Sequence, residues 1–239
     1  MDFVSPIFDL YSDYLLVNQG QSTATGLSAL VDGKLSHDAI TRSLHEQTYT
    51  SAHLWQVVKP FVQQIACSNA VLTLDDTVEA KPYMDQNPLI RFHYDHCQQA
   101  TIKGINQLTA LYTGESVSLP VAYELIEKDL PVLDKKSGKT KWTSRSSKQE
   151  RFRRLIRQSL NNNLVFRYIL ADSWFSSAEN FTYIAGLGQQ FIMPLKGNRK
   201  LALSQADQQQ DGISRSDRWP SKSVNPLSFG WWGWIFRSC

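Results

Sequence analysis

Two short apolar runs, each followed by an aspartate, constrain the fold of this chain more than any other feature. The first covers residues 70–74 and leads into Asp75 and Asp76, and the second covers residues 166–171 and leads into Asp172. Runs of five or six residues rich in Val, Leu, Ile and Tyr are typical of buried strands. If the two strands lie side by side, their aspartates could hold divalent cations for phosphoryl transfer. The alternative is a pair of ordinary turn residues, since Asp is common where strands end.

The first 68 residues predict a small helical region. Residues 22–31 and 36–44 carry apolar side chains at helical spacing, and the turn signal Asp32-Gly33 separates them. This is the pattern of a helix-turn-helix DNA-binding motif, but it is also that of any two short helices joined by a glycine turn. A longer helix is expected to follow over residues 52–67.

From residue 69 the pattern changes to strands alternating with helices. The first aspartate-ended strand precedes two strands joined by a Gly-containing hairpin, then a helix, the second aspartate-ended strand, another helix and a last strand. After the first strand, these elements are expected at 102–112, 118–126, 148–160, 165–172, 178–187 and 190–195. Such alternation predicts an α/β fold in which helices flank a mixed sheet.

Charge is divided unevenly along the chain. Residues 1–134 hold 7 Lys/Arg against 16 Asp/Glu, whereas residues 135–239 hold 18 against 6. Ten cations, opposed only by Glu150, form what we call the basic tract: Lys135, Lys136, Lys139, Lys141, Arg145, Lys148, Arg151, Arg153, Arg154 and Arg157. This density predicts binding to nucleic acid, because cations that neutralise phosphates release counterions. A solvated loop and helix face is the alternative.

Several classes of protein are disfavoured by the sequence. No apolar run approaches the 18 residues of a membrane-spanning helix, and the acidic N-terminus is unlike a signal peptide. Three cysteines without CxxC spacing indicate a reducing compartment, so we expect a cytoplasmic protein. No phosphate-binding loop or dinucleotide fingerprint occurs, and no nucleotide cofactor is expected.

Two aromatic-containing segments leave alternatives open. His93 and His96, with Cys97 beside them, could ligate a metal, but no further ligand lies nearby in sequence, which disfavours a metal site; a structural or DNA-contacting role is the alternative. Trp174 follows the second aspartate, where it either packs beneath the sheet or stacks on an extruded base.

The chain resembles bacterial DDE transposases of the insertion sequence 4 superfamily, whose catalytic domain has a ribonuclease-H-like fold. The resemblance covers residues from about 10 to about 205, and the pairing of Asp-Asp-Thr-Val-Glu with Ala-Asp-Ser-Trp-Phe is fairly specific. It is carried by residues 74–83, 93–96, 103–106, 118–121, 170–175 and 194–199. The resemblance implies a helical N-terminal region over 1–68 and a catalytic core over 69–203.

The resemblance also implies a site and its partners. Asp76, before Thr77, takes the place of the first catalytic, metal-binding aspartate; Asp75 is less favoured because adjacent strand residues point to opposite faces. Asp172 takes the place of the second. Two Mg²⁺ ions, with Mn²⁺ as an alternative, and transposon-end DNA are the implied cofactor and partner. Phosphate contacts are expected from the basic tract, chiefly Lys139, Lys141, Arg145, Lys148, Arg151 and Arg154, and from Lys81, Lys103, Lys196 and Arg199 at the rim.

The third carboxylate of that family has no evident counterpart. After Asp172 the only acids are Glu179, Asp207, Asp211 and Asp217, and no Tyr-Arg-Glu-Lys segment occurs. Residues 204–239 would begin the family's inserted region, but their Trp-rich end suggests a frameshifted or truncated tail. We therefore expect a transposase that cleaves DNA poorly. The alternatives are a non-catalytic DNA-binding or inhibitory fragment, with a second copy or a full-length transposase as partner, and a non-functional remnant.

Overall fold

A computed structural model describes residues 6–46, 48–95, 98–135, 138–196, 200–201 and 214–215. Its contacts separate two compact units, Met1–Thr50 and Ser51–Cys239. The helix expected at 52–67 lies in the second unit, where it packs on the sheet, rather than with the N-terminal helices. The tail residues for which the sequence suggests a frameshift lie almost wholly outside the described residues.

The first unit contains three described helices, α1 (Pro6–Val17), α2 (Ala24–Leu30) and α3 (His37–His45). The side chains of Thr23 and Ser36 cap α2 and α3 by accepting a backbone N–H three residues on. Its own small core is formed by Tyr14, Leu27 and Ile40.

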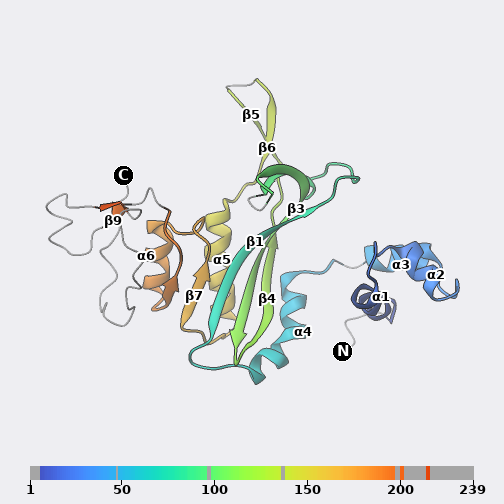
Figure 1. Ribbon diagram of the computed structural model, residues 1–239, viewed down its shortest axis with the longest axis horizontal. Helices are drawn as coiled ribbons and strands as arrows, with labels where there is room; N and C mark the ends of the chain where they lie inside the picture. Colours follow the sequence, from blue (N-terminus) through green and yellow to red (C-terminus); the bar gives the residue numbers. More distant parts are fainter. Residues whose placement is uncertain are drawn as a thin grey trace. The chain divides into compact units, whose positions relative to one another are not determined.

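The second unit is built on a mixed sheet with helices against it (Figure 1). Its elements are α4 (Ser51–Gln64), β1 (Val71–Ala80), β2 (Arg91–Asp95), β3 (Ala100–Gly114), β4 (Val117–Leu125), β5 (Leu130–Leu133), β6 (Thr140–Thr143), α5 (Lys148–Asn161), β7 (Tyr168–Ala171), α6 (Ala178–Gly186), β8 (Gln190–Ile192), β9 (Lys200–Leu201) and β10 (Ser214–Arg215).

Strand order in the main sheet is that of a ribonuclease-H-like fold, as the sequence predicts. The central path runs β2-β3-β1-β7-β8. Strand β4 also pairs with β3, along the part of β3 that follows the segment paired with β2. Strand β1 is antiparallel to β3 but parallel to β7, and β7 is parallel to β8. Four strands joined by antiparallel pairing, β1 to β4, are therefore extended by the parallel strands β7 and β8, with α5 in the connection that returns the chain to the centre of the sheet.

The antiparallel half of the sheet forms for local reasons. Apolar residues alternate along β3 with buried positions every second residue, and a two-residue turn at Glu115 and Ser116 reverses the chain into β4. Both turn residues have positive φ (49° and 73°), the conformation that matches the twist of paired strands. This hairpin confirms the one that the sequence predicts.

Two parts of the second unit differ from the sequence prediction. Strand β1 does not end at its aspartates but continues to Ala80, because the long β3 keeps pairing with it as far as Gly104. The sequence predicts no strand between residues 126 and 148, but Leu130–Leu133 and Thr140–Thr143 pair as the hairpin β5–β6, which carries Lys141 of the basic tract. Its strands are too short and too exposed to show a buried alternation in the sequence.

The core lies between the sheet and its helices. Helix α5, which confirms the helix expected at 148–160, contributes Phe152, Leu155 and Ile156 and packs on β3 and β4. Helix α6 packs against β8 and α5, and α4 packs against β4. No helix within the described ranges is long and apolar enough to cross a membrane.

Candidate functional site

The C-terminal end of β7 lies beside the middle of β1, and this is where the aspartates gather. Leu74 and Ala171 form the last pair of the parallel register, so the next residues are Asp75 and Asp172. The Asp172 carboxylate accepts the backbone N–H of Trp174 at 3.0 Å, and the Asp75 carboxylate accepts that of Asp76 at 2.9 Å. Asp172 is exposed at this edge.

Asp76 extends the buried row of β1 that begins with Leu72 and Leu74. Its partner in the register is the buried Leu108, and the neighbouring position on that face of β3 is Asn106, which is fully buried. Asn106 Nδ2 donates to Asp76 Oδ2 at 3.1 Å, and Lys148 Nζ, at the start of α5, forms an ion pair with the same oxygen. The apolar core thus gives way at this point to a polar cluster.

Asp75 interacts electrostatically with both Asp76 and Asp172. Burial raises the pKa of Asp75, and the negative charges of Asp76 and Asp172 raise it further, while the backbone N–H of Asp76 and the Lys148 ammonium lower it. In the sequence, Asp75 is less favoured than Asp76 as the first metal-binding aspartate, because the two side chains point to opposite faces of the strand. The missing signal is the parallel register, which sets Asp75 rather than Asp76 alongside Asp172.

Two buried polar atoms near Asp76 have no hydrogen-bond partner in the described part of the chain. They are Asn106 Oδ1 and His93 Nε2. Burial and, to a smaller extent, the positive charges of Lys128 and Lys148 lower the pKa of His93 to about 4, against an opposing effect of Asp76. His93 is therefore a neutral imidazole at physiological pH. His96 and Cys97 lie outside the described residues.

A pocket of about 600 Å³ opens beside Asp76. Its walls carry three cationic side chains, several hydroxyl groups and two aromatic rings; they include Lys128, Arg145, Lys148, Ser144, Ser146, Tyr94 and Trp174. Both Asp76 and His93 line it as well. The pocket therefore combines two carboxylates, those of Asp76 and Glu150, with groups that bind phosphate.

The acceptors at this edge fit a hard divalent cation in chemical type. Carboxylate and amide oxygens are ligands of Mg²⁺, and Asp75, Asp76 and Asp172 supply the former while the unpartnered Asn106 Oδ1 supplies the latter. Within the described ranges, however, no three His, Cys, Asp or Glu side chains gather as a metal-binding group. One oxygen of Asp76 is instead engaged by Lys148.

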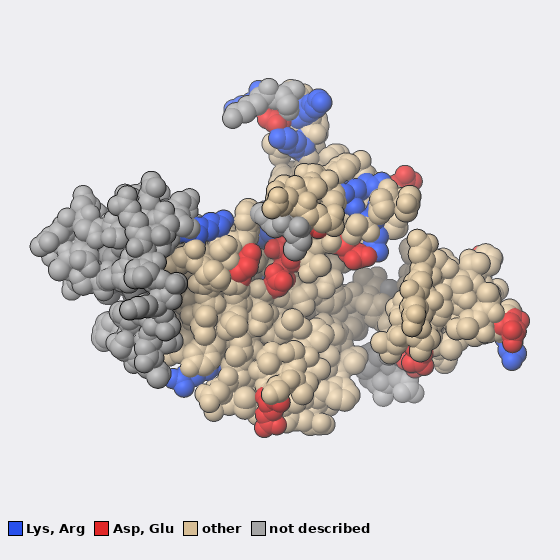
Figure 2. All heavy atoms as spheres, in the orientation of Figure 1, with Lys and Arg blue, Asp and Glu red and all other residues tan. Residues whose placement is uncertain are grey.

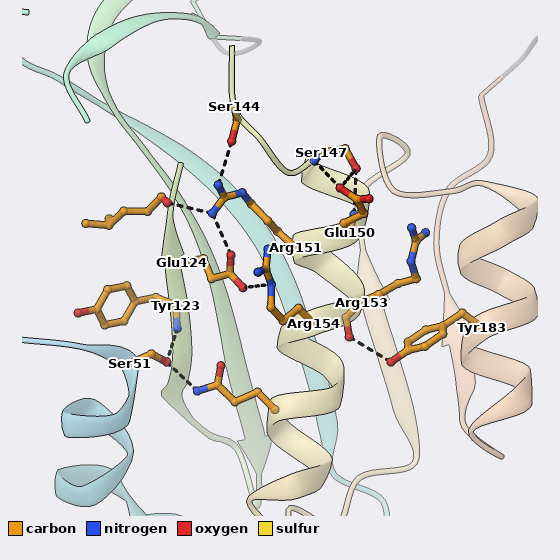
Figure 3. Close-up of polar contacts among 12 residues, drawn as sticks. Ser51, Tyr123, Glu124, Ser144, Ser147, Glu150, Arg151, Arg153, Arg154 and Tyr183 are labelled. Carbon is orange, nitrogen blue, oxygen red and sulfur yellow. Dashed lines mark hydrogen bonds and ion pairs between the residues drawn. The ribbon is translucent and has the colours of Figure 1, made fainter. Parts of the chain in front are cut away.

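The basic tract divides into two parts of different character. From Arg145 onward, many of its cations are bound within the fold. Arg151 Nη1 and Arg154 Nε lie 3.0 and 2.8 Å from the carboxylate of Glu124 (Figure 3). The Arg151 side chain is only 13% exposed, and Arg145 pairs with Asp129 at 2.7 Å.

The other part of the tract lies on the projecting hairpin β5–β6. Every described strand residue of this hairpin is exposed, and Lys and Arg side chains gather on it in Figure 2. Lys139 and Lys141 lie here, the latter 2.5 Å from Asp134. The Arg91 guanidinium lies over the Trp142 ring at 4.2 Å, which ties the hairpin to β2.

The lysines predicted at the rim lie in two places, Lys81 and Lys103 beside the paired ends of β1 and β3, and Lys196 beside Trp174. The Lys81 ammonium lies 3.4 Å from Glu79, and its backbone N–H donates to the carbonyl of the partly buried Lys103. Lys196 Nζ lies 4.6 Å from the centre of the Trp174 ring. This contact places Trp174 at the surface with a cation over it, not beneath the sheet. Arg199 lies outside the described residues.

Comparison with known proteins gives a family. A family model described as "DDE superfamily endonuclease" matches residues 8–226. Among solved structures, "Mos1 transposase paired-end complex with left transposon end" is 11% identical with a TM-score of 0.27, and the match covers 78% of this chain and 58% of that one. For "Crystal structure of a pre-cleavage Mos1 transpososome" the values are 12%, 0.27, 76% and 57%. The chain thus spans less than two thirds of these chains. A search of curated proteins found no significant match.

Proposed function

Since the chain belongs to the DDE superfamily of endonucleases, we propose that it derives from a transposase of the insertion sequence 4 type. Its activity would be metal-dependent strand cleavage and transfer at transposon ends. The observation that carries this proposal is the meeting of β1 and β7, where Asp75 and Asp172 follow the last paired residues and Asp76 lines a cation-rich pocket.

In this proposal Asp76 and Asp172 hold the metal ions, and Asp75 contributes to their field. The divalent cations, Mg²⁺ or Mn²⁺, supply activation of water and of a 3′-hydroxyl for attack on phosphorus. Asn106 orients the Asp76 carboxylate through its hydrogen bond. The lysines and hydroxyl groups of the pocket bind the phosphates on either side of the bond that is cut.

The DNA surface that we propose combines the pocket with the hairpin β5–β6. A two-stranded ribbon fits the major groove of DNA, and this hairpin carries two exposed lysines, Lys139 and Lys141. Arg151 and Arg154 contribute less in this view, because both are committed to Glu124. A second copy of the chain, or a full-length transposase, would be the protein partner at paired ends.

A second candidate function is DNA binding without cleavage. It is favoured by the lack, within the described ranges, of a three-residue metal-binding group. Glu179, the first acid after Asp172, lies in the first turn of α6, and the remaining acids fall outside the described residues. Such a protein would occupy transposon ends and inhibit a complete transposase.

One assay separates the two candidates. Purified protein is incubated with end-containing DNA and Mg²⁺ or Mn²⁺, alongside Asp76→Ala, Asp172→Ala and Asp75→Ala. Cleavage abolished by Asp76→Ala and Asp172→Ala supports the enzyme, and the Asp75→Ala arm decides which residue of the pair is essential. We expect weak cleavage at most, with binding retained. Absence of binding to end DNA would contradict both candidates.

The DNA surface is tested by salt dependence. Replacing Lys139 and Lys141 by Ala should weaken binding and reduce the slope of log K against log salt by about 0.9 for each phosphate that the variant no longer neutralises. Lys59→Ala, an exposed lysine on α4, is the matched control and should leave the slope unchanged. An unchanged slope in the hairpin variant would exclude the hairpin from the interface.

A further inference from the structure

Asp76 forms an ion pair with Lys148 inside the candidate metal site. Its side chain is 17% exposed, and that of Lys148 is 28% exposed. Both Asn106 Nδ2 and Lys148 Nζ engage Oδ2, so neither of them occupies Oδ1. We propose that Lys148 is an internal counter-ion of Asp76 that a divalent cation must displace. The inference rests on the function proposed above, in that it concerns the same metal site.

The contact is supported by elements distant in sequence. Lys148 is the first residue of α5, 72 positions after Asp76, and the N-terminus of that helix is fixed by a capping box between Ser147 and Glu150. A carboxylate at the boundary of an apolar core has lost much of its water and requires compensation. Asn106 supplies a neutral donor, and Lys148 supplies the opposite charge.

A metal ion and Lys148 cannot share this carboxylate favourably. A divalent cation bound to Asp76 would lie within a few ångströms of the ammonium group, in a partly desolvated site where repulsion between like charges is strong. Asn106 carries no charge and can keep its hydrogen bond when the metal binds. Of the two partners of Oδ2, only Lys148 must therefore leave.

The pocket offers a destination for the displaced side chain. Lys148 already lines it together with Lys128 and Arg145, so a released ammonium group would add to the cations that face a bound phosphate. The helix N-terminus itself is a poorer phosphate site, because the backbone N–H groups of Ser147 and Glu150 are taken by the capping box and the Glu150 carboxylate lies there. Metal binding would thus make Lys148 available to DNA.

The counter-ion role is tested first without metal. Thermal unfolding is measured with EDTA for the wild-type protein, Lys148→Met, Asp76→Asn and the double variant. Each single variant should lower Tm by about 4 °C or more, since it leaves a partly buried charge without its partner. The double variant should lose less than the sum of the two. Additive losses would overturn the inference and leave the proposed function untouched.

The displacement is tested by binding of Mn²⁺ in the absence of DNA, measured by calorimetry or by the electron paramagnetic resonance signal of free Mn²⁺. Lys148→Met should bind Mn²⁺ about tenfold more tightly than the wild-type protein or more, because the competing charge is gone. Lys148→Arg should stay close to wild type. Lys128→Met removes a charge from the same pocket without touching Asp76, and its effect should be clearly smaller.

The outcomes are distinct. Unchanged or weaker Mn²⁺ binding in Lys148→Met, with Asp76-dependent binding in the wild-type protein, would show that Lys148 positions Asp76 rather than competing for it, and would overturn the inference alone. If neither the wild-type protein nor any variant, Lys148→Met included, binds Mn²⁺ saturably, the proposed metal site and this inference are both overturned.

Discussion

The polar end of the sheet depends on single residues that compensate one another. Asp76, Asn106 and Lys148 form one connected cluster, and His93 lies near it with a nitrogen that has no hydrogen-bond partner among the described residues. A neutral imidazole suits this position, because two lysines already lie close and the side chain is buried. His93 should consequently limit the stability of the protein in acid.

This gives a pH-dependent prediction. Burial lowers the pKa of His93 to about 4, whereas an unfolded chain has a histidine pKa of about 6.5. Between these values the unfolded state binds a proton that the folded state does not. The favourable contribution is therefore fully present above pH 6.5 and is lost as the pH falls toward 4. In His93→Gln, Tm should fall less steeply over this range.

The matched control for that measurement is His45→Gln, which changes an exposed histidine at the end of α3. Its Tm should follow the wild-type profile over the same range. A His93→Gln profile parallel to that of the wild-type protein would show that folding does not change the protonation of His93 and would contradict this prediction.

At the scale of elements, α5 is joined to β4 by an ionic cluster rather than by apolar contacts alone. The Glu124 carboxylate on β4 binds Arg154 with one oxygen and Arg151 with the other, and Arg151 also donates to the carbonyl of Leu125 and the hydroxyl of Ser144 (Figure 3). This cluster positions the helix that carries Lys148.

Removing the shared carboxylate should therefore be costly. Glu124→Gln leaves the nearly buried Arg151 without its anion, and loss of one partner of a buried ion pair costs about 3–5 kcal/mol. We expect a loss of about 3 kcal/mol in the free energy of unfolding, measured by urea denaturation. Glu127→Gln, an exposed position shortly after β4, should change it by less than about 0.5 kcal/mol. Equal effects of the two variants would contradict this account of the cluster.

The elements also show what a sequence can and cannot predict here. The hairpin β3–β4 and the stripe of α5 have periodic burial, and both follow from the spacing of apolar residues. The role of Glu124 does not, because a carboxylate on a strand carries no local sign of the two arginines that approach it from a helix later in the chain. For the same reason, the sequence predicts the basic tract as a single DNA-binding surface and does not show that Arg151 and Arg154 are paired within the fold.

The candidate site, like the fold, can be predicted from the sequence only in part. Two aspartates after short apolar runs indicate neighbouring strand positions, and the structure brings Asp172 alongside β1. It is the register, set by pairs such as Leu74 with Ala171, that selects Asp75 as the neighbour of Asp172. Long-range register depends on packing of the whole sheet and is not visible in the sequence, where the family resemblance favours Asp76.

At the scale of the whole molecule, the two units have separate cores. The first unit packs around Leu27 and Ile40, while the second packs around residues such as Leu108 and Ile156. Units with independent cores are expected to open independently, since each is stabilised by its own buried contacts. Amide hydrogen exchange followed by mass spectrometry measures this for each unit within the full chain.

Two variants make that expectation specific. Ile40→Ala removes a fully buried side chain from the first unit and should destabilise it by about 2–5 kcal/mol, with faster exchange across α1 to α3 and unchanged exchange in β1, β3 and α5. Leu108→Ala, equally buried in the second unit, should do the reverse. The small core of the first unit leaves it little stability to lose, so Ile40→Ala is expected to unfold it. Exchange that rises in both units in either variant would mean that the chain unfolds as one cooperative body.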